Sequence, residues 1–505
     1  MKGAVASGHP LTSDAACEML SKGGNAFDAV VAAGFASAVT EPTLTGLGGG
    51  GFMVCHKHKT RQDIVIDFFV NTPGVGCRNI TPPQLIPVDI RFRSTIQRFY
   101  TGIGSVAVPG TLRGLIHCYK NFCTMDIGDI IRPALEYLEK GVEVTETMAY
   151  LLNILRPILT SEAYGREIFN VGKGDILYNP LLREFLNGSN PEQWLRRLYR
   201  FGHQPFLEHM NRGECLLTEN DFRKYRVIER RPLIIRYRDY EIMTNPPPSF
   251  GGILLKLSLS LLNEYEISGM SDEEYRHLLA SLMESTLEMK KDSPSDEKER
   301  FPFNRDIIMS AKRELDRIFR GVSSISTRGT THISILDSDG NAASMTASNG
   351  SNSGCFFGDT GIMLNNMMGE DDLHPCGFYS LSPGRRVSSM MSPSLIRENG
   401  NIFGVMGSGG SKRIRTAIPQ VIINLLDRGM DVRDAVEAPR LHLDEAGILQ
   451  VEPGIDKDTI DSLNEHYDVN QWQYKDMYFG GVHTVLNDLT GHGDSRRGGC
   501  FMKVH

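Results

Sequence analysis

The chain has 505 residues and a formal net charge of −7, and hydrophobic residues make up 40% of it. This length allows a large core, arranged as more than one conventional domain or as a single large sandwich. The negative charge offers no basic field to nucleic acid or to an anionic membrane, so the expected partners are small molecules or other proteins.

The nine cysteines are scattered, with no Cys-x-x-Cys pair and no histidine partner at metal spacing. They predict reduced thiols, no metal site and no cofactor. The chain starts without the charged and then apolar stretch of an export signal, and its longest apolar run, 29–39, is too short to span a bilayer. We therefore expect a cytosolic protein, although a signal removed from the sequence would reverse this inference.

The first half of the chain predicts helices around a hairpin. Residues 11–45 predict two helices, with Ser13-Asp14 as the first cap and a break at 23–25. Alternation over 52–69 predicts two strands, and 111–160 predicts further helices. The glycine run before the strands lacks the Lys-Ser/Thr of a phosphate loop, so tight backbone packing is favoured.

Later segments predict turns and helix starts. Three consecutive prolines predict a rigid turn before a helix that begins at Gly251-Gly252. Residues 288–305 carry dense mixed charge, which predicts a solvated connection. Gly409 and Gly410 open a predicted helix over 412–428, where their N–H groups either hold an oxyanion or simply cap the helix.

Two alternating runs flank Asp339-Gly340, which is a strong hairpin signal. Counting outward from a two-residue turn places Thr331 opposite Ser348, with Thr330 beside it. Cross-strand neighbours are only about 5 Å apart, so the Ser348 hydroxyl could orient the Thr330 hydroxyl. The ordinary alternative is one more half-buried hairpin.

A threonine hydroxyl needs a nearby base to act as a nucleophile, and a free α-amine has a pKa of about 7.7–8.0. If the Thr330 hydroxyl attacks the carbonyl of Gly329, hydrolysis of the resulting ester cuts the chain before Thr330. The cut creates the free amine, so nucleophile and base then lie on one residue.

The run Gly-Thr-Thr-His-x-Ser-x-x-Asp-x-x-Gly-Asn-Ala from residue 329 resembles the processing junction of the γ-glutamyltranspeptidases, which are N-terminal nucleophile hydrolases. Similar segments extend over nearly the whole chain: Gly-Gly-Gly-Gly-Phe at 48–52, Val-Pro-Gly-Thr at 108–111, Gly-Ile-x-Leu-Asn-Asn at 361–366, Ser-Ser-Met at 388–390 and Gly-Ser-Gly-Gly at 407–410. The resemblance implies an α+β fold, a four-layer αββα sandwich. It also implies cleavage between Gly329 and Thr330 into segments 1–329 and 330–505, paired as a heterodimer within one αββα unit.

The same resemblance implies roles for individual residues. Thr330 would attack a γ-glutamyl amide such as glutathione and pass the acyl group to water or to an acceptor amine. Gly409 and Gly410 would stabilise the oxyanion, and Thr331 and Ser348 would support the nucleophile. The substrate contacts implied are Ser388 and Ser389 for the carboxylate, and Glu370 or Asp371 for the amine.

Two departures from the family pattern bear on substrate choice. Asp-Phe-Arg-Glu of typical members is replaced by Asp67-Phe68-Phe69-Val70, and a ring cannot replace a guanidinium that clamps a carboxylate. An arginine of the 91–98 segment could supply it instead. The connection from 370 to 387 is also short for a lid, and an open site favours hydrolysis over transfer. The alternatives are an amidase for another acyl group and a non-catalytic relative, and the intact Thr330 argues against the second.

Overall fold

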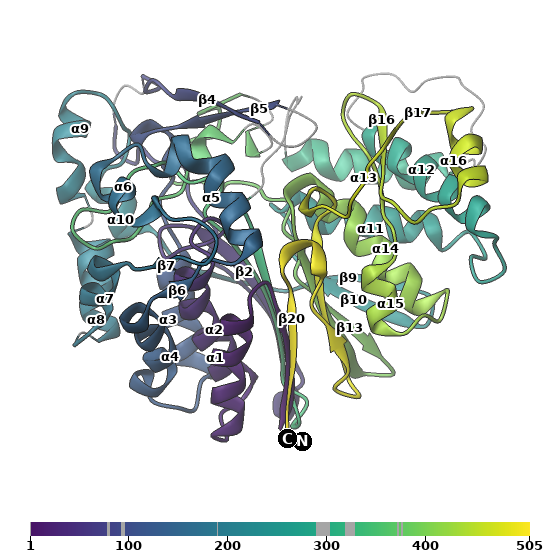
Figure 1. The fold of residues 1–505 in the computed structure, drawn as a ribbon, viewed down its shortest axis with the longest axis horizontal. Coiled ribbons are helices and arrows are strands. Elements are labelled where there is room, and N and C mark those ends of the chain that lie inside the picture. The colour runs from purple at the N-terminus through teal and green to yellow at the C-terminus, as the bar shows by residue number, and fades with distance from the viewer. Residues whose placement is uncertain are drawn as a thin grey trace.

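The computed structural model describes residues 2–77, 81–91, 96–188, 190–201, 203–288, 303–318, 329–370, 373–374 and 377–505. Two β-sheets lie face to face at the centre, and helices cover the outer face of each (Figure 1). This arrangement gives four layers in the order αββα, which confirms the predicted α+β sandwich.

Both sheets are built from both halves of the chain. The first has the strand order β20 (Cys500–Val504), β1 (Gly3–Ser7), β11 (Thr331–Asp337), β12 (Ala342–Ser348), β2 (Gly50–Lys57), β3 (Gln62–Asp67) and β8 (Ile228–Arg230). The second has the order β19 (Gly491–His492), β18 (Gly481–Leu486), β14 (Asn401–Gly409), β13 (Ser394–Glu398), β10 (Tyr240–Thr244) and β9 (Leu233–Tyr237). Segments 1–329 and 330–505 therefore contribute strands to both sheets, and the division between them stays a prediction.

The helical layers differ in origin. The layer on the first sheet contains α1 (Pro10–Ser21), α2 (Ala26–Thr40), α3 (Thr111–Phe122) and α4 (Ile127–Lys140). The layer on the second sheet contains α11 (Phe250–Leu262), α12 (Asp272–Glu288) and α14 (Ile414–Leu426). Further elements surround these layers: β4 (Ile86–Arg91), β5 (Ile96–Thr101), α5 (Glu146–Leu159), α6 (Ala163–Phe169), α7 (Pro180–Leu186), α8 (Pro191–Leu195), α9 (Leu207–Asn211), α10 (Glu219–Lys224), α13 (Arg305–Ile318), α15 (Val432–Glu437), β16 (Ile448–Val451) and α16 (Lys457–Asn464).

The predicted helices over 11–45 and 111–160 and the hairpin over 52–69 are present, but the predicted cap of the first helix is wrong. That helix begins at Pro10, and the side chain of His9 accepts a hydrogen bond from the N–H of Leu11 (3.2 Å). Proline suits the first helical position because its missing N–H would have no partner there. Ser13 is buried within the helix instead.

Alternation along β11 sends neighbouring side chains to opposite faces of the first sheet. Ile333 and Ile335 pack in the core shared with α2. The Ser334 hydroxyl instead donates to the carbonyl of His483 in the second sheet (2.9 Å). By the same alternation, Thr331 faces the helices and Thr330 faces the second sheet.

In the part of the chain that the structure describes, no helix combines the length and hydrophobicity needed to cross a bilayer. Within the same residues, no group of three or more His, Cys, Asp or Glu side chains is arranged to hold a metal ion. The predicted substrate contact Asp371 and most of the charged connection, 289–302, lie outside the described residues.

Candidate active site

The strands β11 and β12 form the predicted hairpin, but the predicted register is wrong by one residue. Thr331 pairs with Ala347 and not with Ser348. Continuing the pairing by one residue places Thr330 directly opposite Ser348. In the structure the candidate nucleophile Thr330 is therefore the direct cross-strand neighbour of Ser348, whereas the predicted register gave that place to Thr331.

The turn of this hairpin explains the shift. It has three residues, 338–340, because the N–H of Asp337 donates to the carbonyl of Asn341 (3.0 Å) and closes the loop one residue further out. Gly340 has a φ of +85°, the left-handed conformation typical of such a loop. The carboxylate of Asp337 also accepts from the N–H groups of Asp339 (3.0 Å) and Asn341 (2.8 Å), which favours this turn over a two-residue one.

Ser348 lies at the peptide bond that is predicted to break. Its hydroxyl donates a hydrogen bond to the carbonyl of Gly329 and accepts one from the N–H of Gly350 (2.9 Å). A donor at that carbonyl polarises it and stabilises the negative charge that forms when a hydroxyl attacks. Thr330 is only 5% exposed, so the bond is also shielded from bulk water. In this uncut chain, Ser348 therefore contacts the carbonyl to be attacked.

The structure places the Thr331 hydroxyl away from the junction. It donates to the carboxyl of Glu41 (2.6 Å), which also accepts from the Thr12 hydroxyl (3.1 Å). Both partners lie on the helical side of the first sheet, as the alternation of β11 requires. Thr331 thus anchors the first residues of β11 to the segment after α2. The predicted support of the nucleophile through the Thr331 hydroxyl is not seen in this contact, which lies on the opposite face of the sheet from Thr330. Sequence reasoning gave Glu41 no role.

Burial raises the pKa of Glu41 from 4.5 to about 7, although its hydrogen bonds with Thr331 and Thr12 oppose the shift. Between pH 4.5 and about 7, the Glu41 carboxyl is deprotonated in the unfolded chain but still protonated in the folded chain. The free energy of unfolding should therefore fall as the pH rises from 4.5 to about 7, by about 3 kcal/mol from this group. Glu41→Gln should remove this dependence.

This prediction is best measured by urea unfolding from pH 4.5 to 8, with the Thr330→Ala substitution in both proteins so that each remains a single chain. The difference in unfolding midpoint between the protein that keeps Glu41 and the Glu41→Gln variant should then change with pH. Parallel curves for the two proteins would show that Glu41 does not titrate in this range.

Gly409 lies next to the carbonyl of Thr330, and Gly410 lies beside Gly480 and Arg497. A β-carbon on Gly409 would be 2.3 Å from the carbonyl oxygen of Thr330, so only glycine fits there. Gly410 has a φ of +122° and precedes the short helical turn that leads into α14. Stabilisation of an oxyanion by their N–H groups stays a prediction.

Arg497 is a neighbour of the nucleophile that sequence reasoning missed. Its guanidinium is buried and donates to the carbonyl of Thr330 (3.1 Å). Burial, and then the charge of Arg413, lowers the pKa of Arg497 to about 10. The sequence showed only an Arg-Arg pair before two glycines, and nothing in that pattern indicates which arginine turns towards residue 330.

The three predicted substrate contacts that the structure describes, Ser388, Ser389 and Glu370, are buried and engaged within the protein. The Ser388 hydroxyl donates to the carbonyl of Leu373 (3.1 Å), and the Ser389 hydroxyl accepts from the N–H of Met391 (3.0 Å). The carboxyl of Glu370 accepts from the N–H of Ser351 (3.0 Å). Of these three residues, Glu370 is the one that contacts the segment after Ser348. The binding of substrate by all three stays a prediction.

Phe69, at the position of the missing arginine, is buried and stacks on Phe52 with ring centroids 5.4 Å apart. Its carbonyl accepts hydrogen bonds from the guanidinium of Arg386 and from the Tyr225 hydroxyl (2.7 Å). Arg386 also pairs with the carboxylate of Asp67 (3.0 Å), so it holds this segment in place and does not replace the clamp.

The described arginines of the 91–98 segment do not reach Thr330 either. Arg98 pairs with Asp89 (2.7 Å) across the β4–β5 hairpin, and both side chains are largely exposed. Arg91 is also exposed on β4. No contact of these two side chains with the described residues supports either as a replacement for the clamp, and that alternative stays a prediction.

Comparison with known proteins agrees with this geometry. A family model described as gamma-glutamyltranspeptidase matches residues 12–504. The Acylase ACY 1 proenzyme of Pseudomonas sp. (strain SE83) is 30% identical over 490 residues, covering 90% of this chain and 84% of that protein. The Glutathione hydrolase proenzyme of Escherichia coli (strain K12) is 28% identical over 508 residues, covering 92% and 84%. Cephalosporin acylase from Bacillus halodurans has the same fold, with a TM-score of 0.81 at 22% identity over 100% of this chain and 96% of that one.

Proposed function

Because the chain belongs to the γ-glutamyltranspeptidase family, we propose that it is a self-processing amide hydrolase and acyltransferase whose nucleophile is the N-terminal Thr330 of the cut chain. The observation that carries this proposal is the hydrogen bond from the Ser348 hydroxyl to the carbonyl of Gly329. It places a charge-stabilising donor at the bond that precedes the threonine.

Processing follows from this arrangement. The Thr330 hydroxyl attacks the carbonyl carbon of Gly329, the bond from that carbon to the Thr330 nitrogen breaks, and an ester forms. Water then hydrolyses the ester, which leaves a carboxylate on Gly329 and a free amine on Thr330. In turnover this amine takes the hydroxyl proton during attack on a substrate amide and returns it to the leaving amine. The acyl group then passes from the threonine to water or to an acceptor amine.

For the substrate, we propose γ-glutamyl amides such as glutathione, with hydrolysis favoured over transfer. In this proposal the carboxyl of Glu370, which accepts from the N–H of Ser351, contacts the substrate amine, while the buried Phe69 leaves the substrate carboxylate without the usual arginine. The second candidate is an amidase for another acyl group, and it is favoured by the same Phe69 and by the similarity to a protein named as an acylase.

Three anilides distinguish these candidates because they differ by one group each: γ-glutamyl, glutaryl, which lacks the amine, and 4-aminobutanoyl, which lacks the carboxylate. We expect the γ-glutamyl compound to exceed the glutaryl compound in kcat/KM by at least about tenfold, which corresponds to about 1.4 kcal/mol for recognition of the amine. The kcat/KM of the 4-aminobutanoyl compound should lie less than about tenfold below that of the γ-glutamyl compound. Glycylglycine should stimulate turnover less than about twofold, because the connection from 370 to 387 is short for a lid and water is then expected to compete for the acyl group.

The Thr330→Ala protein provides the blank for these assays. Preference for glutaryl or for another acyl anilide would favour the second candidate. A large fall in kcat/KM with the 4-aminobutanoyl compound, together with strong stimulation by glycylglycine, would contradict the absence of a carboxylate clamp and of a lid.

A further inference from the structure

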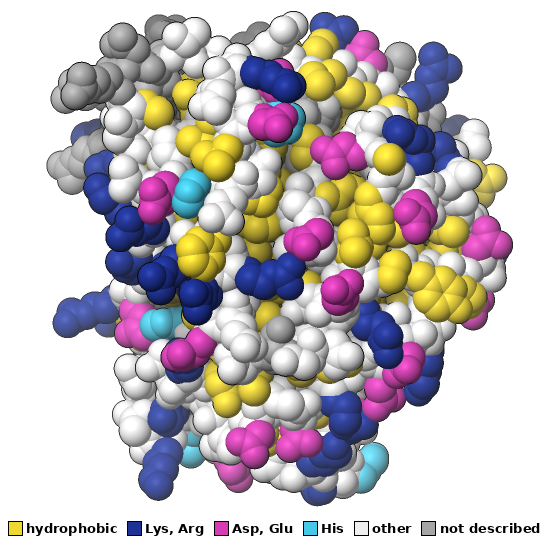
Figure 2. All heavy atoms as spheres, turned by 90° about the vertical axis from the view of Figure 1, so that its left-hand side faces the viewer, with side chains coloured by type: hydrophobic (Ala, Val, Ile, Leu, Met, Phe, Trp, Pro, Cys, Tyr) yellow, Lys and Arg dark blue, Asp and Glu magenta, His cyan; other side chains and the backbone are white. Residues whose placement is uncertain are grey.

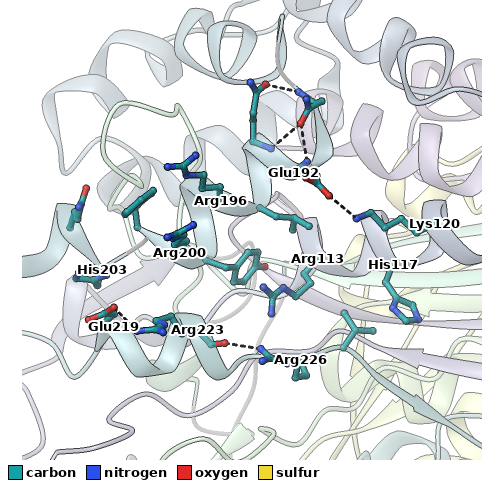
Figure 3. A pocket seen from close by; sticks show the side chains of 17 residues that line it. Arg113, His117, Lys120, Glu192, Arg196, Arg200, His203, Glu219, Arg223 and Arg226 are labelled. Atoms are coloured by element: carbon teal, nitrogen blue, oxygen red, sulfur yellow. Dashed lines mark hydrogen bonds and ion pairs between the residues drawn. The ribbon is translucent and has the colours of Figure 1, made fainter.

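A cleft of about 1260 Å³ opens on the outside of segment 1–329, far along the chain from the junction. It lies between α3, α10 and the helical turn Arg196–Arg200 that follows α8 (Figure 3). Six arginine and lysine side chains line it: Arg113, Lys120, Arg196, Arg200, Arg223 and Arg226. Only two carboxylates do so, Glu192 and Glu219. Figure 2 shows Lys and Arg side chains gathered on this face, in a chain whose net charge is −7.

The two carboxylates pair with only two of the six cations. Glu219 pairs with Arg223 (3.0 Å), and Glu192 approaches Lys120 (3.9 Å). Among the described residues, no carboxylate pairs with the four remaining guanidiniums, which belong to Arg113, Arg196, Arg200 and Arg226. Like charges held this closely repel one another unless an anion lies between them.

Two of these guanidiniums are held in fixed positions. Arg113 lies 4.2 Å from the centre of the Tyr199 ring and donates to the carbonyl of Tyr225. Arg226 donates to the same carbonyl (2.8 Å). Burial lowers the pKa of Arg113, and the neighbouring charge of Arg226 adds to this effect. A guanidinium has five N–H donors, so one or two bonds to the backbone leave others for a ligand.

The other two guanidiniums share an aromatic support. Arg196 and Arg200 lie 5.3 Å and 5.6 Å from the centre of the Phe201 ring. Arg196 and Arg200 are both exposed on the helical turn that forms one wall of the cleft (Figure 3). The cleft thus has two guanidiniums held by one backbone carbonyl and two exposed guanidiniums on the helical turn.

We propose that this cleft binds a small ligand with a chain of two or more phosphate groups. Arginine forks match phosphate oxygens in paired hydrogen bonds, and five of the six cations are arginines. A phosphate group carries about −1.5 to −2 charges, so a chain of two or three phosphates supplies enough negative charge to offset the four guanidiniums that no carboxylate among the described residues pairs with. The lining contains none of the candidate catalytic residues, so the proposal does not rest on the proposed function.

The test is isothermal titration calorimetry of the processed protein with inorganic tripolyphosphate, with ATP and with a glutamate oligomer of similar charge. We expect both phosphate probes to bind, and to bind more weakly as salt is raised. Arg196→Glu combined with Arg200→Glu should weaken the binding of tripolyphosphate and of ATP by at least about tenfold, because two attractive charges become repulsive. The matched control is Arg236→Glu combined with Arg433→Glu, two exposed arginines outside the cleft, which should change affinity less than about twofold.

The arms of this experiment distinguish the sources of the phosphate. Tighter binding of ATP than of tripolyphosphate assigns the site to nucleotides, and equal binding assigns it to the phosphate chain alone. The proposal is overturned if neither phosphate probe binds at low salt, if the control pair loses as much affinity as the cleft pair, or if the glutamate oligomer binds as tightly as the phosphates.

Discussion

Thr330→Ala is expected to leave the 505-residue chain uncut and without amidase activity. The substitution removes the hydroxyl that attacks the carbonyl of Gly329, and the buried junction offers water little access to the bond. Without the cut, no α-amine forms to serve as the base of turnover. A denaturing gel should show one band for the variant and two for the parent protein, and sequencing of the smaller parent fragment should begin at Thr330.

Two further variants serve as controls for the nucleophile. Thr330→Ser keeps a hydroxyl and should still be cut, more slowly. Thr331→Ala removes the bond to Glu41 and should lower stability while processing continues. A Thr330→Ala chain that still breaks between residues 329 and 330 would show that another group performs the attack.

Ser348→Ala is expected to slow processing by about 100-fold, the usual cost of losing one donor to an oxyanion. The hydroxyl donates to the carbonyl of Gly329 in the uncut chain, so its contribution should grow as negative charge forms on that oxygen. The rate is measured by following the uncut band of freshly refolded protein with time. Turnover of the anilide by the fraction that has been cut shows whether the same hydroxyl also serves the substrate reaction.

Ser344→Ala is the matched control for this experiment, because it removes another buried hydroxyl of β12. The Ser344 hydroxyl donates to the carbonyl of Met406 (2.9 Å), well away from the junction. Its loss should lower stability without slowing processing. Equal rates for the Ser348→Ala and parent proteins would mean that the carbonyl of Gly329 finds its stabilising donor elsewhere.

Local sequence patterns were sufficient to predict the hairpin and most helices of the first layer, and the nucleophile on that hairpin stays a prediction. Alternation over β11 and β12 is a property of neighbouring residues, and so are the glycine pairs that open a helix. The register of that hairpin was predicted wrongly because the count assumed a two-residue turn, whereas the carboxylate of Asp337 favours a three-residue turn.

The partners of the site were decided only by the tertiary structure. Glu41 accepts a hydrogen bond from the Thr331 hydroxyl, although the two residues are 290 positions apart in the sequence. Arg497 donates to the carbonyl of Thr330 across 167 positions. Such pairs form because the two sheets and the helical layer fold over one another, and no spacing in the sequence encodes them.

Phe69, which replaces the arginine of typical family members, also shows what the sequence determined and what only the tertiary structure decided. The sequence by itself determined that a ring stands where typical members carry a guanidinium. Only the tertiary structure decided where that ring lies, in the core against Phe52, and that the buried Arg386 is already bound to Asp67. Burial also raises the pKa of Glu41 and lowers that of Arg497, because a charge in the interior loses the water that would solvate it.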